Sequence, residues 1–407
     1  MASPLHRHCS SLDEVIFPDQ QCLTPEEHDK ATKLFDKLIE RFEPLQTSNK
    51  DYRPLTLIRL TKEEVSAEDE FLILFFTLIE HDHLGVTTEI RVAEVLARLH
   101  TFERWTSEEQ NILLQCLVHF ADYLIDNFFL PLKLTAAKAT QPTMIDSLEP
   151  TIGTPQHIPD LRQACLTRDR HRCVVTRKFD IREAEKRCKV LDGDNVKDDD
   201  GNPLLQEAKG MTYLEVAYII PHSLMSHSDI HIAGESKLAT HKILMMFDPK
   251  TISLINKTNI NQQLLNTLTL THDLHQSFRA FEITFEQVQD HPHTYTINYI
   301  DPNRMFRIHR LPITRTLYAT PNGSIEPPSP QLLKVHHSIG RILHFSAAGE
   351  YLDKFIQDME EMEEGGGICS NGSTRVDDYV RVCLGSEEPG YLVLRKDFGF
   401  RDTRLDT

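Results

Sequence analysis

The chain has 407 residues, which is enough for two or three domains with separate cores. Hydrophobic residues make up 40% and charged residues 26%, as in ordinary globular proteins, and no apolar run is long enough to cross a bilayer, so we expect no membrane association. The net charge of −17 argues against non-specific binding of nucleic acid over the whole surface.

The eight cysteines are scattered and include no Cys-x-x-Cys pair. This pattern argues against a zinc ribbon or a disulfide scaffold and favours reduced thiols. The N-terminal segment has no apolar stretch typical of a secretory signal. We therefore expect an intracellular protein, nuclear or cytoplasmic, that is not secreted.

Residues 1–22 are expected to be a flexible tail and residues 23–134 a helical domain. Thr24 to Glu27 form a capping box with Pro25 at the first helical position, and apolar residues follow at helical spacing. Further helices are predicted over 67–81, 88–99 and 107–128, the last one stopping before Pro131. No polar constellation stands out among them, which indicates a support or interaction domain.

Residues 135–160 carry four prolines and are expected to be a linker. A mixed domain is predicted over 161–290, with a short helix up to Asp169, a strand at 173–176 and an acidic insertion at 191–209.

Residues 291–357 are expected to extend this domain. Strands are predicted at 295–300 and 306–311, and a helix after the prolines at 327–330 should pack back onto the core. Residues 358–407 are expected to form an acidic, glycine-containing tail with a weak hairpin at 391–400.

The segment 162–189 is locally basic. Between Leu161 and Val190 there are ten Lys and Arg against four Asp and Glu. If the chain binds DNA or RNA, this segment is the expected contact. The alternative is an arginine-rich face that is simply solvated.

Three sequence blocks carry the residues with possible chemistry. They are RDRHRCVVT at 168–176, LEVAYIIPHSL at 214–224 and NTLTLTHDLHQSF at 266–278. In the third block Asn266 is followed by alternating apolar residues, and His275 comes nine positions later. This pattern predicts a strand that leads into a helix presenting His275, then a strand from Phe281 that covers the same site.

In this order, the three blocks resemble the HNH endonuclease domain of the ββα-metal type found in fungal proteins. The resemblance covers about 161–290, and the helix after 327–330 is similar to the usual C-terminal extension. It implies an α+β fold, with a helical N-terminal domain before a ββα-metal core, C-terminal strands and a packing helix. It also implies phosphodiester hydrolysis with a single divalent metal ion (Mg, Mn, Ni or Zn) and no small-molecule cofactor.

The resemblance assigns a role to individual residues. Asn266 fills the slot of the Asn that orients the general base or helps hold the metal-bound water. His275 fills the slot of the metal ligand. Tyr218 fills the slot of the general-base His, and a phenol with a pKa near 10 is a poor base at neutral pH. We therefore expect hydrolysis to be impaired or lost.

Other residues bear on the same site. His222 is a candidate replacement base, and Asp273 is a candidate second metal ligand. Glu215 is a weaker candidate ligand, because strand alternation turns it to the face opposite Tyr218. Arg279 would repel a cation, and Arg177 stands where the family usually has Gly.

Two functions remain open. One is a metal-dependent endonuclease with weak activity. The other is a catalytically inactive, nuclease-derived protein that binds nucleic acid or regulates a partner. A scaffold without a nucleic-acid role is a third, plainer possibility.

Overall fold

The computed structural model describes residues 22–46, 51–84, 91–138, 157–190, 196–221, 224, 235–255, 263–302, 310–318, 320 and 325–365. These residues form two compact units. The helical unit takes the described residues within Met1–Leu130, Ala233–Ala239 and Ser346–Thr407, and the mixed unit takes those within Pro131–Ile232 and Thr240–Phe345. The extension expected at 291–357 is therefore split: residues up to Phe345 belong to the mixed unit, and residues from Ser346 belong to the helical unit. Most of the expected linker and the whole hairpin at 391–400 lie outside the described residues.

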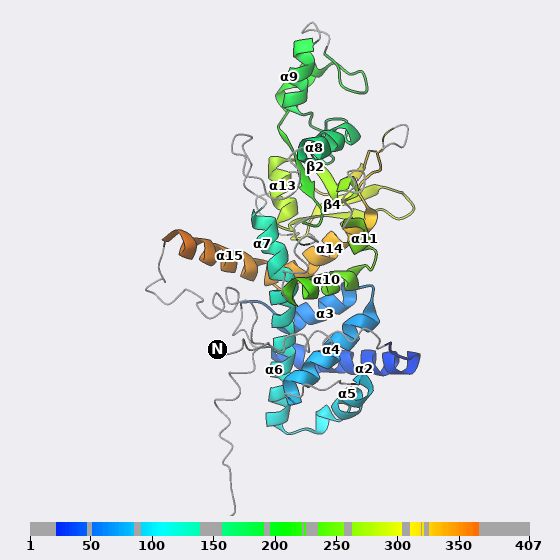
Figure 1. Cartoon of the computed structure of the whole chain (residues 1–407), viewed down its shortest axis with the longest axis vertical. Coiled ribbons are helices and arrows are strands. Elements are labelled where there is room, and N and C mark those ends of the chain that lie inside the picture. Colours follow the sequence, from blue (N-terminus) through cyan, green and yellow to red (C-terminus); the bar gives the residue numbers. More distant parts are fainter. Residues whose placement is uncertain are drawn as a thin grey trace, which may run out of the picture. The chain divides into compact units, whose positions relative to one another are not determined.

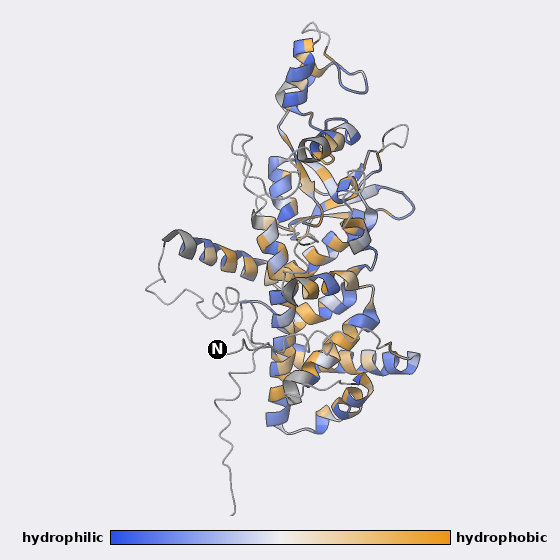
Figure 2. Cartoon of the chain, in the orientation of Figure 1, coloured by the Kyte–Doolittle hydropathy of each residue, from blue (hydrophilic) through white to orange (hydrophobic). Residues whose placement is uncertain are grey.

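The helical unit begins with five helices (Figure 1): α2 (Pro25–Phe42), α3 (Pro54–Glu64), α4 (Glu68–Leu84), α5 (Val92–Leu99) and α6 (Ser107–Leu124). The predicted capping box is confirmed, since Glu27 N–H donates to Thr24 Oγ1 over 3.3 Å and Thr24 N–H to Glu27 Oε2 over 2.9 Å. Helix α4 is apolar around most of its circumference (Figure 2), which explains why it is buried. Edge-to-face contacts among Phe35, Phe75 and Phe120 join α2, α4 and α6.

The prediction that the last N-terminal helix stops before Pro131 is wrong. A π-helical turn at Ile125–Phe129 follows α6, and α7 (Leu130–Lys138) continues through the proline. Proline is tolerated in the first turn of a helix, and the π turn just before it already interrupts the regular hydrogen-bond ladder. Within the described residues, Ser107–Ala136 is long and apolar enough to cross a membrane, but 56% of its most apolar window is buried inside the protein, as in the core helix of a soluble protein.

Helix α15 (Ala348–Gly365) also belongs to the helical unit. The rings of Tyr52 and Tyr351 lie 5.0 Å apart, and the Arg53 N–H donates to the carbonyl of Ser346 over 2.8 Å. The Tyr52 hydroxyl in turn lies 2.6 Å from Asp122 on α6. A C-terminal element therefore completes a unit that the sequence alone assigned to the N-terminal part of the chain.

The mixed unit contains two antiparallel sheets. The first pairs β1 (Leu214–Tyr218) with β2 (Thr267–Thr271), and the second has the order β3 (Ile283–Gln287), β4 (Thr294–Tyr299) and β5 (Ile313–Thr316). Helices α8 (His157–Arg168), α9 (Ile181–Val190), α11 (Thr251–Ile255), α13 (His272–Arg279) and α14 (Pro330–Phe345) accompany them, with most of α10 (Glu235–Phe247). The predicted α+β class is confirmed, and the predicted strand at 306–311 lies mostly outside the described residues.

Helix α14 packs on β3 and α13, which confirms the prediction that it returns to the core. His336 on α14 lies between the rings of Phe278 and Phe281, at 3.9 and 4.6 Å between ring centroids, and its Nε2 lies 2.9 Å from the Phe278 carbonyl oxygen. Gly340 allows the close approach, since a Cβ there would lie 2.4 Å from Ile300 Cδ1. The packing of His336 against Phe278 stabilises the C-terminal end of α13, the helix that carries His275.

The predicted strand at 173–176 is wrong, because these residues form a tight turn. The Cys173 N–H donates to the Lys178 carbonyl and the Arg177 N–H donates to the Cys173 carbonyl, each over 3.0 Å. Arg177 adopts a left-handed backbone, with φ of 63°. The apolar run suggested a strand because all its residues are buried, yet burial comes here from the surrounding elements and not from sheet pairing.

Candidate metal and catalytic site

The site is built on the pairing of β1 with β2. In this register Glu215 lies opposite Leu270 and Tyr218 lies opposite Thr267. Successive side chains of a strand point to opposite faces. Glu215 and Ala217 therefore share one face, while Val216 and Tyr218 share the other. The turn at 173–177 joins the far edge of β2, where the Val174 N–H donates to the Thr269 carbonyl over 2.9 Å.

Helix α13 brings His275 to the Glu215 face of this sheet. Oε2 of Glu215 lies 2.6 Å from Nδ1 of His275, and Oε1 lies 2.8 Å from Nδ1 of His272. One carboxylate thus bridges two imidazoles. Side-chain alternation was correctly predicted to turn Glu215 away from Tyr218, but the inference that this removes Glu215 from the site failed, because His275 approaches from that same face.

The protonation of His275 follows from its surroundings. Burial lowers the pKa of His275, and the Glu215 carboxylate opposes this shift without cancelling it. Burial acts to raise the pKa of Glu215, but the hydrogen bonds from His275 and His272 outweigh it, so the net pKa is lowered. At neutral pH the pair is therefore a carboxylate accepting the Nδ1–H of a neutral imidazole. The lone pair of His275 then resides on Nε2, the atom available to a metal ion.

Asn266 is held in a buried, fully paired position. Its Oδ1 accepts from the Ile220 N–H over 2.9 Å, and its Nδ2 donates to the Ile220 carbonyl over 2.8 Å. The carboxamide thus makes both hydrogen bonds of the Ile220 backbone, as a neighbouring strand would, and Ile220 lies two residues beyond Tyr218. In this structure both polar ends of Asn266 fix the backbone after β1, and it acts on the site through that backbone.

Arg168 supports the same region and was not singled out from the sequence. Its side chain is fully buried, pairs with Asp169 over 2.8 Å and donates to the carbonyls of Leu264 and Thr267 over 2.7 and 2.9 Å. These carbonyls flank Asn266 on both sides. A buried charge is retained only when it is paired and hydrogen-bonded, and Arg168 meets this condition. Nothing in the local sequence of Arg168 distinguishes it from the other arginines of the segment 162–189.

Tyr218 lies on the other face of β1. Its side chain is 37% exposed, and it neighbours the Cys165 thiol of α8. Partial burial raises the pKa of Tyr218, and the nearby Cys165 adds to the increase. A phenol needs a lowered pKa to accept a proton at neutral pH, so the shift runs against a role as general base.

The remaining candidates have different positions. Asp273 is half-buried in the first turn of α13, and His222 lies outside the described residues. Arg279 donates to Gln276 over 2.7 Å, and burial lowers its pKa while the nearby Glu215 opposes the shift. The positively charged guanidinium of Arg279 thus lies near the Glu215–His275 pair. Among the residues that the structure describes, no three His, Cys, Asp or Glu side chains are grouped to hold a metal ion.

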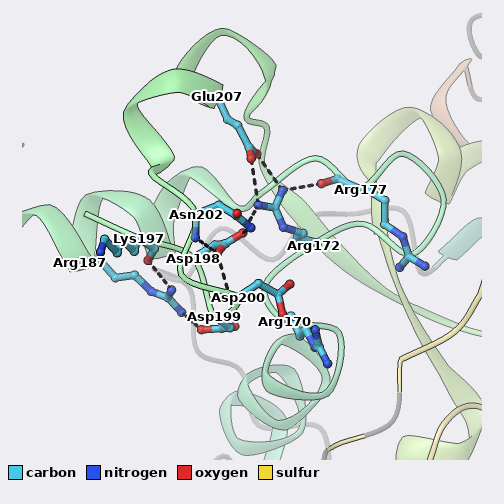
Figure 3. Close-up of polar contacts among 10 residues, drawn as sticks. All are labelled: Arg170, Arg172, Arg177, Arg187, Lys197, Asp198, Asp199, Asp200, Asn202 and Glu207. Carbon is cyan, nitrogen blue, oxygen red and sulfur yellow. Dashed lines mark hydrogen bonds and ion pairs between the residues drawn. The ribbon is translucent and has the colours of Figure 1, made fainter. Parts of the chain in front are cut away.

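The predicted nucleic-acid segment 162–189 is largely neutralised inside the protein (Figure 3). Each aspartate of the run 198–200 pairs with one arginine: Asp198 with Arg172 at 2.7 Å, Asp199 with Arg187 at 2.6 Å and Asp200 with Arg170 at 2.5 Å. Glu207 adds a second carboxylate to Arg172 at 2.8 Å. The acidic insertion and the basic segment, which look independent in the sequence, form one ion-pair network.

Comparison with known proteins agrees with this geometry. Residues 173–286 match a family described as HNH endonuclease, a span that runs from the turn at Cys173 through β1, β2 and α13 to β3. Searches of curated proteins and of solved structures gave no match. The matched span contains Tyr218, Asn266 and His275. The chain therefore carries an HNH endonuclease domain at residues 173–286.

Proposed function

We propose that this protein is an HNH-type, metal-dependent nuclease that keeps the cation-binding part of its site and has lost its general base. The observation that carries this proposal is the 2.6 Å contact between Glu215 and His275. A carboxylate that accepts the Nδ1–H of a histidine fixes the tautomer and directs Nε2 outward, an arrangement that recurs around metal-binding histidines.

The residues present suit a weakly held divalent cation. His275 supplies one neutral nitrogen, whereas Asp273, two positions earlier on α13, points to nearly the opposite side of the helix, so the remaining ligands would be water or the phosphate of the substrate. A cation bound there would stabilise the negative charge that develops on a phosphodiester during hydrolysis. The neighbouring Arg279 guanidinium reduces its affinity by repulsion, so the ion is expected to bind more tightly when a phosphate is present as well.

Hydrolysis is expected to be slow because no group in the base slot can accept a proton. Removal of general-base catalysis typically costs about 10²–10⁴-fold in rate. The raised pKa of Tyr218 keeps its hydroxyl protonated at neutral pH. His222 stays a candidate replacement base. The proposed activity is therefore impaired cleavage of nucleic acid and not efficient turnover.

The second candidate is a catalytically inactive protein that binds nucleic acid or regulates a partner. It is favoured by one observation, the Arg279 guanidinium close to Glu215. If that guanidinium replaces the metal charge altogether, the domain retains the fold and the phosphate attraction without the chemistry.

Cleavage of supercoiled plasmid with Mg²⁺, Mn²⁺, Ni²⁺ or Zn²⁺ tests the proposal. We compare the wild type with Tyr218→His, His275→Ala and, as a matched control, His272→Ala, whose imidazole is exposed. We expect slow nicking by the wild type, little gain in Tyr218→His, because position 218 lies on the face of β1 opposite His275, and loss in His275→Ala only. Equal nicking in His275→Ala would contradict a metal role for His275, and no cutting by any variant would favour the inactive binding protein.

A further inference from the structure

The ion-pair network divides α9 into two faces. On the inner face Arg187 donates to Glu183 over 2.9 Å, to Asp199 over 2.6 Å and to the Lys197 carbonyl over 2.9 Å (Figure 3). Hydrogen bonds from Arg172 and Asn202 lower the pKa of Asp198 to about 2, although burial opposes the shift. Asp198 is therefore ionised at physiological pH, and the arginines paired in this network are not available to an external phosphate.

The outer face of α9 is basic and solvent-exposed. Arg182, Lys186 and Lys189 follow one another at i, i+4 and i+7, which places them along one side of the helix. Lys186 is 68% exposed and has only a 3.6 Å contact with Glu183, and Arg182 and Lys189 form no ion pair with any residue that the structure describes. Glu185, one position before Lys186 on the same helix, is an exposed carboxylate close in sequence to this stripe.

An exposed aromatic ring lies beside one end of the stripe. Tyr213, the residue before β1, is 55% exposed, and the guanidinium of Arg182 lies 5.5 Å from its ring centroid. Tyr213 is more exposed than Tyr218, at 37%, and than the buried Tyr295 and Tyr299 of the same unit. Basic side chains next to an exposed aromatic ring are the elements that single-stranded nucleic acid uses, the cations for its phosphates and the ring for its bases.

We propose that the outer face of α9 and Tyr213 bind a single strand of nucleic acid, with phosphates along Arg182, Lys186 and Lys189 and an unpaired base stacked on Tyr213. The inference rests on the proposed function, since it names the surface by which the nuclease domain holds its substrate. In a chain with net charge −17, this stripe offers the electrostatic attraction that most of the surface lacks. The polar character of α9 along its length is visible in Figure 2.

The test is fluorescence anisotropy of the full chain with a labelled oligothymidylate of about 20 nucleotides at several salt concentrations, with a duplex of equal length alongside. The main variant combines Arg182→Glu, Lys186→Glu and Lys189→Glu. The matched control combines Lys30→Glu, Lys33→Glu and Lys37→Glu, which makes the same charge change on exposed positions of α2. Tyr213→Ala is compared with Tyr213→Phe.

We expect the α9 triple variant to bind the single strand at least tenfold more weakly near 100 mM salt, and its salt slope to fall by about 2, because each single-strand phosphate contact contributes about 0.7. The α2 control should change affinity less than about twofold. Tyr213→Ala should weaken single-strand binding about tenfold with little effect on the duplex, and Tyr213→Phe should bind as the wild type. Glu185→Lys should tighten binding, which tests the surface with a variant that removes no hydrogen bond or ion pair between residues that the structure describes.

The proposal is overturned if the α9 and α2 triple variants behave alike, if Tyr213→Ala changes both probes equally, or if the wild type does not bind the strand. Calorimetric titration of Ni²⁺ against the same variants separates this failure from failure of the nuclease proposal. Unchanged Ni²⁺ binding that depends on His275 would leave the metal site standing while the α9 surface is rejected. If His275→Ala binds Ni²⁺ as tightly as the wild type, the metal site is rejected, whatever the result for α9.

Discussion

Oε2 of Glu215 on β1 lies 2.6 Å from Nδ1 of His275 on α13, although 60 residues separate them along the chain. The contact orders the site because it links the strand that carries Tyr218 to the helix that carries the proposed metal ligand. It also sets the tautomer of His275. The chemistry proposed for the domain depends on this pair more than on any single residue of the sequence blocks.

Glu215→Gln should weaken binding of Ni²⁺ or Zn²⁺ by roughly 10–100-fold, as expected when the carboxylate behind a metal-binding histidine is lost. The amide keeps the size of the side chain but removes the charge and satisfies only one imidazole as acceptor. Isothermal titration calorimetry measures the change, and His272→Ala serves as control because it removes the more exposed partner. Equal affinity in wild type and Glu215→Gln would show that the carboxylate does not support a metal ligand.

Acidification should loosen the contact between α14 and α13. Burial lowers the pKa of His336 to about 3, against about 6.5 in the unfolded chain. Below pH 6.5 the unfolded chain takes up a proton that the folded protein does not, so the free energy of unfolding falls with pH. The loss reaches about 2 kcal/mol at pH 5.

Hydrogen exchange of peptides from α13 and α14 measures this effect at pH 7 and pH 5, after correction for intrinsic exchange. His336→Phe retains a ring between Phe278 and Phe281 but cannot be protonated, so its stability should fall less on acidification. A wild type and a His336→Phe variant with the same pH dependence would rule out His336 as the source.

Asn266→Ala should destabilise the mixed unit by about 2–4 kcal/mol, because it leaves the buried N–H and carbonyl of Ile220 without partners. Asn266→Asp should not rescue the loss, since its second oxygen would face the Ile220 carbonyl. Asn298→Ala on β4 is the control with an exposed side chain; it loses one hydrogen bond, from the Tyr299 N–H over 2.9 Å, and should cost about 0.5–1.5 kcal/mol. Urea unfolding followed by circular dichroism gives the comparison, and an Asn266→Ala variant as stable as Asn298→Ala would contradict it.

Arg177 occupies a left-handed backbone position that glycine adopts without a steric penalty. Arg177→Ala keeps this cost and loses the 2.6 Å hydrogen bond to the Thr316 carbonyl and the contact with the Tyr318 ring, 4.2 Å from the guanidinium. Arg177→Gly loses the same contacts but relieves the backbone. We expect Arg177→Gly to be more stable than Arg177→Ala by about 1 kcal/mol in thermal unfolding. The reverse order would mean that the turn at 173–177 changes conformation in the variants.

Much of the local structure could be predicted from the sequence. The capping box at Thr24 begins a helix, the alternation after Asn266 forms a strand, and His275 lies on the helix that follows. These features depend on neighbours within a few residues, and spacing encodes them directly. Two local predictions failed, at Pro131 and at 173–176. Proline in the first turn of a helix leaves the same pattern as a helix end, and a turn with buried apolar residues leaves the same pattern as a strand.

The spacing in the sequence was enough to predict that a strand follows Asn266 and that His275 lies on the helix after that strand; that Tyr218 occupies the slot of a general base is an expectation from the family resemblance. Only the tertiary structure decided that α13 meets β1 on the Glu215 face, which makes Glu215 and not Tyr218 the partner of His275. It also decided that the aspartates at 198–200 neutralise Arg170, Arg172 and Arg187, which leaves the outer face of α9 as the basic surface. The physical reason is the same in both cases: a charge acts on whatever lies within a few ångströms of it, and those neighbours come from distant parts of the chain.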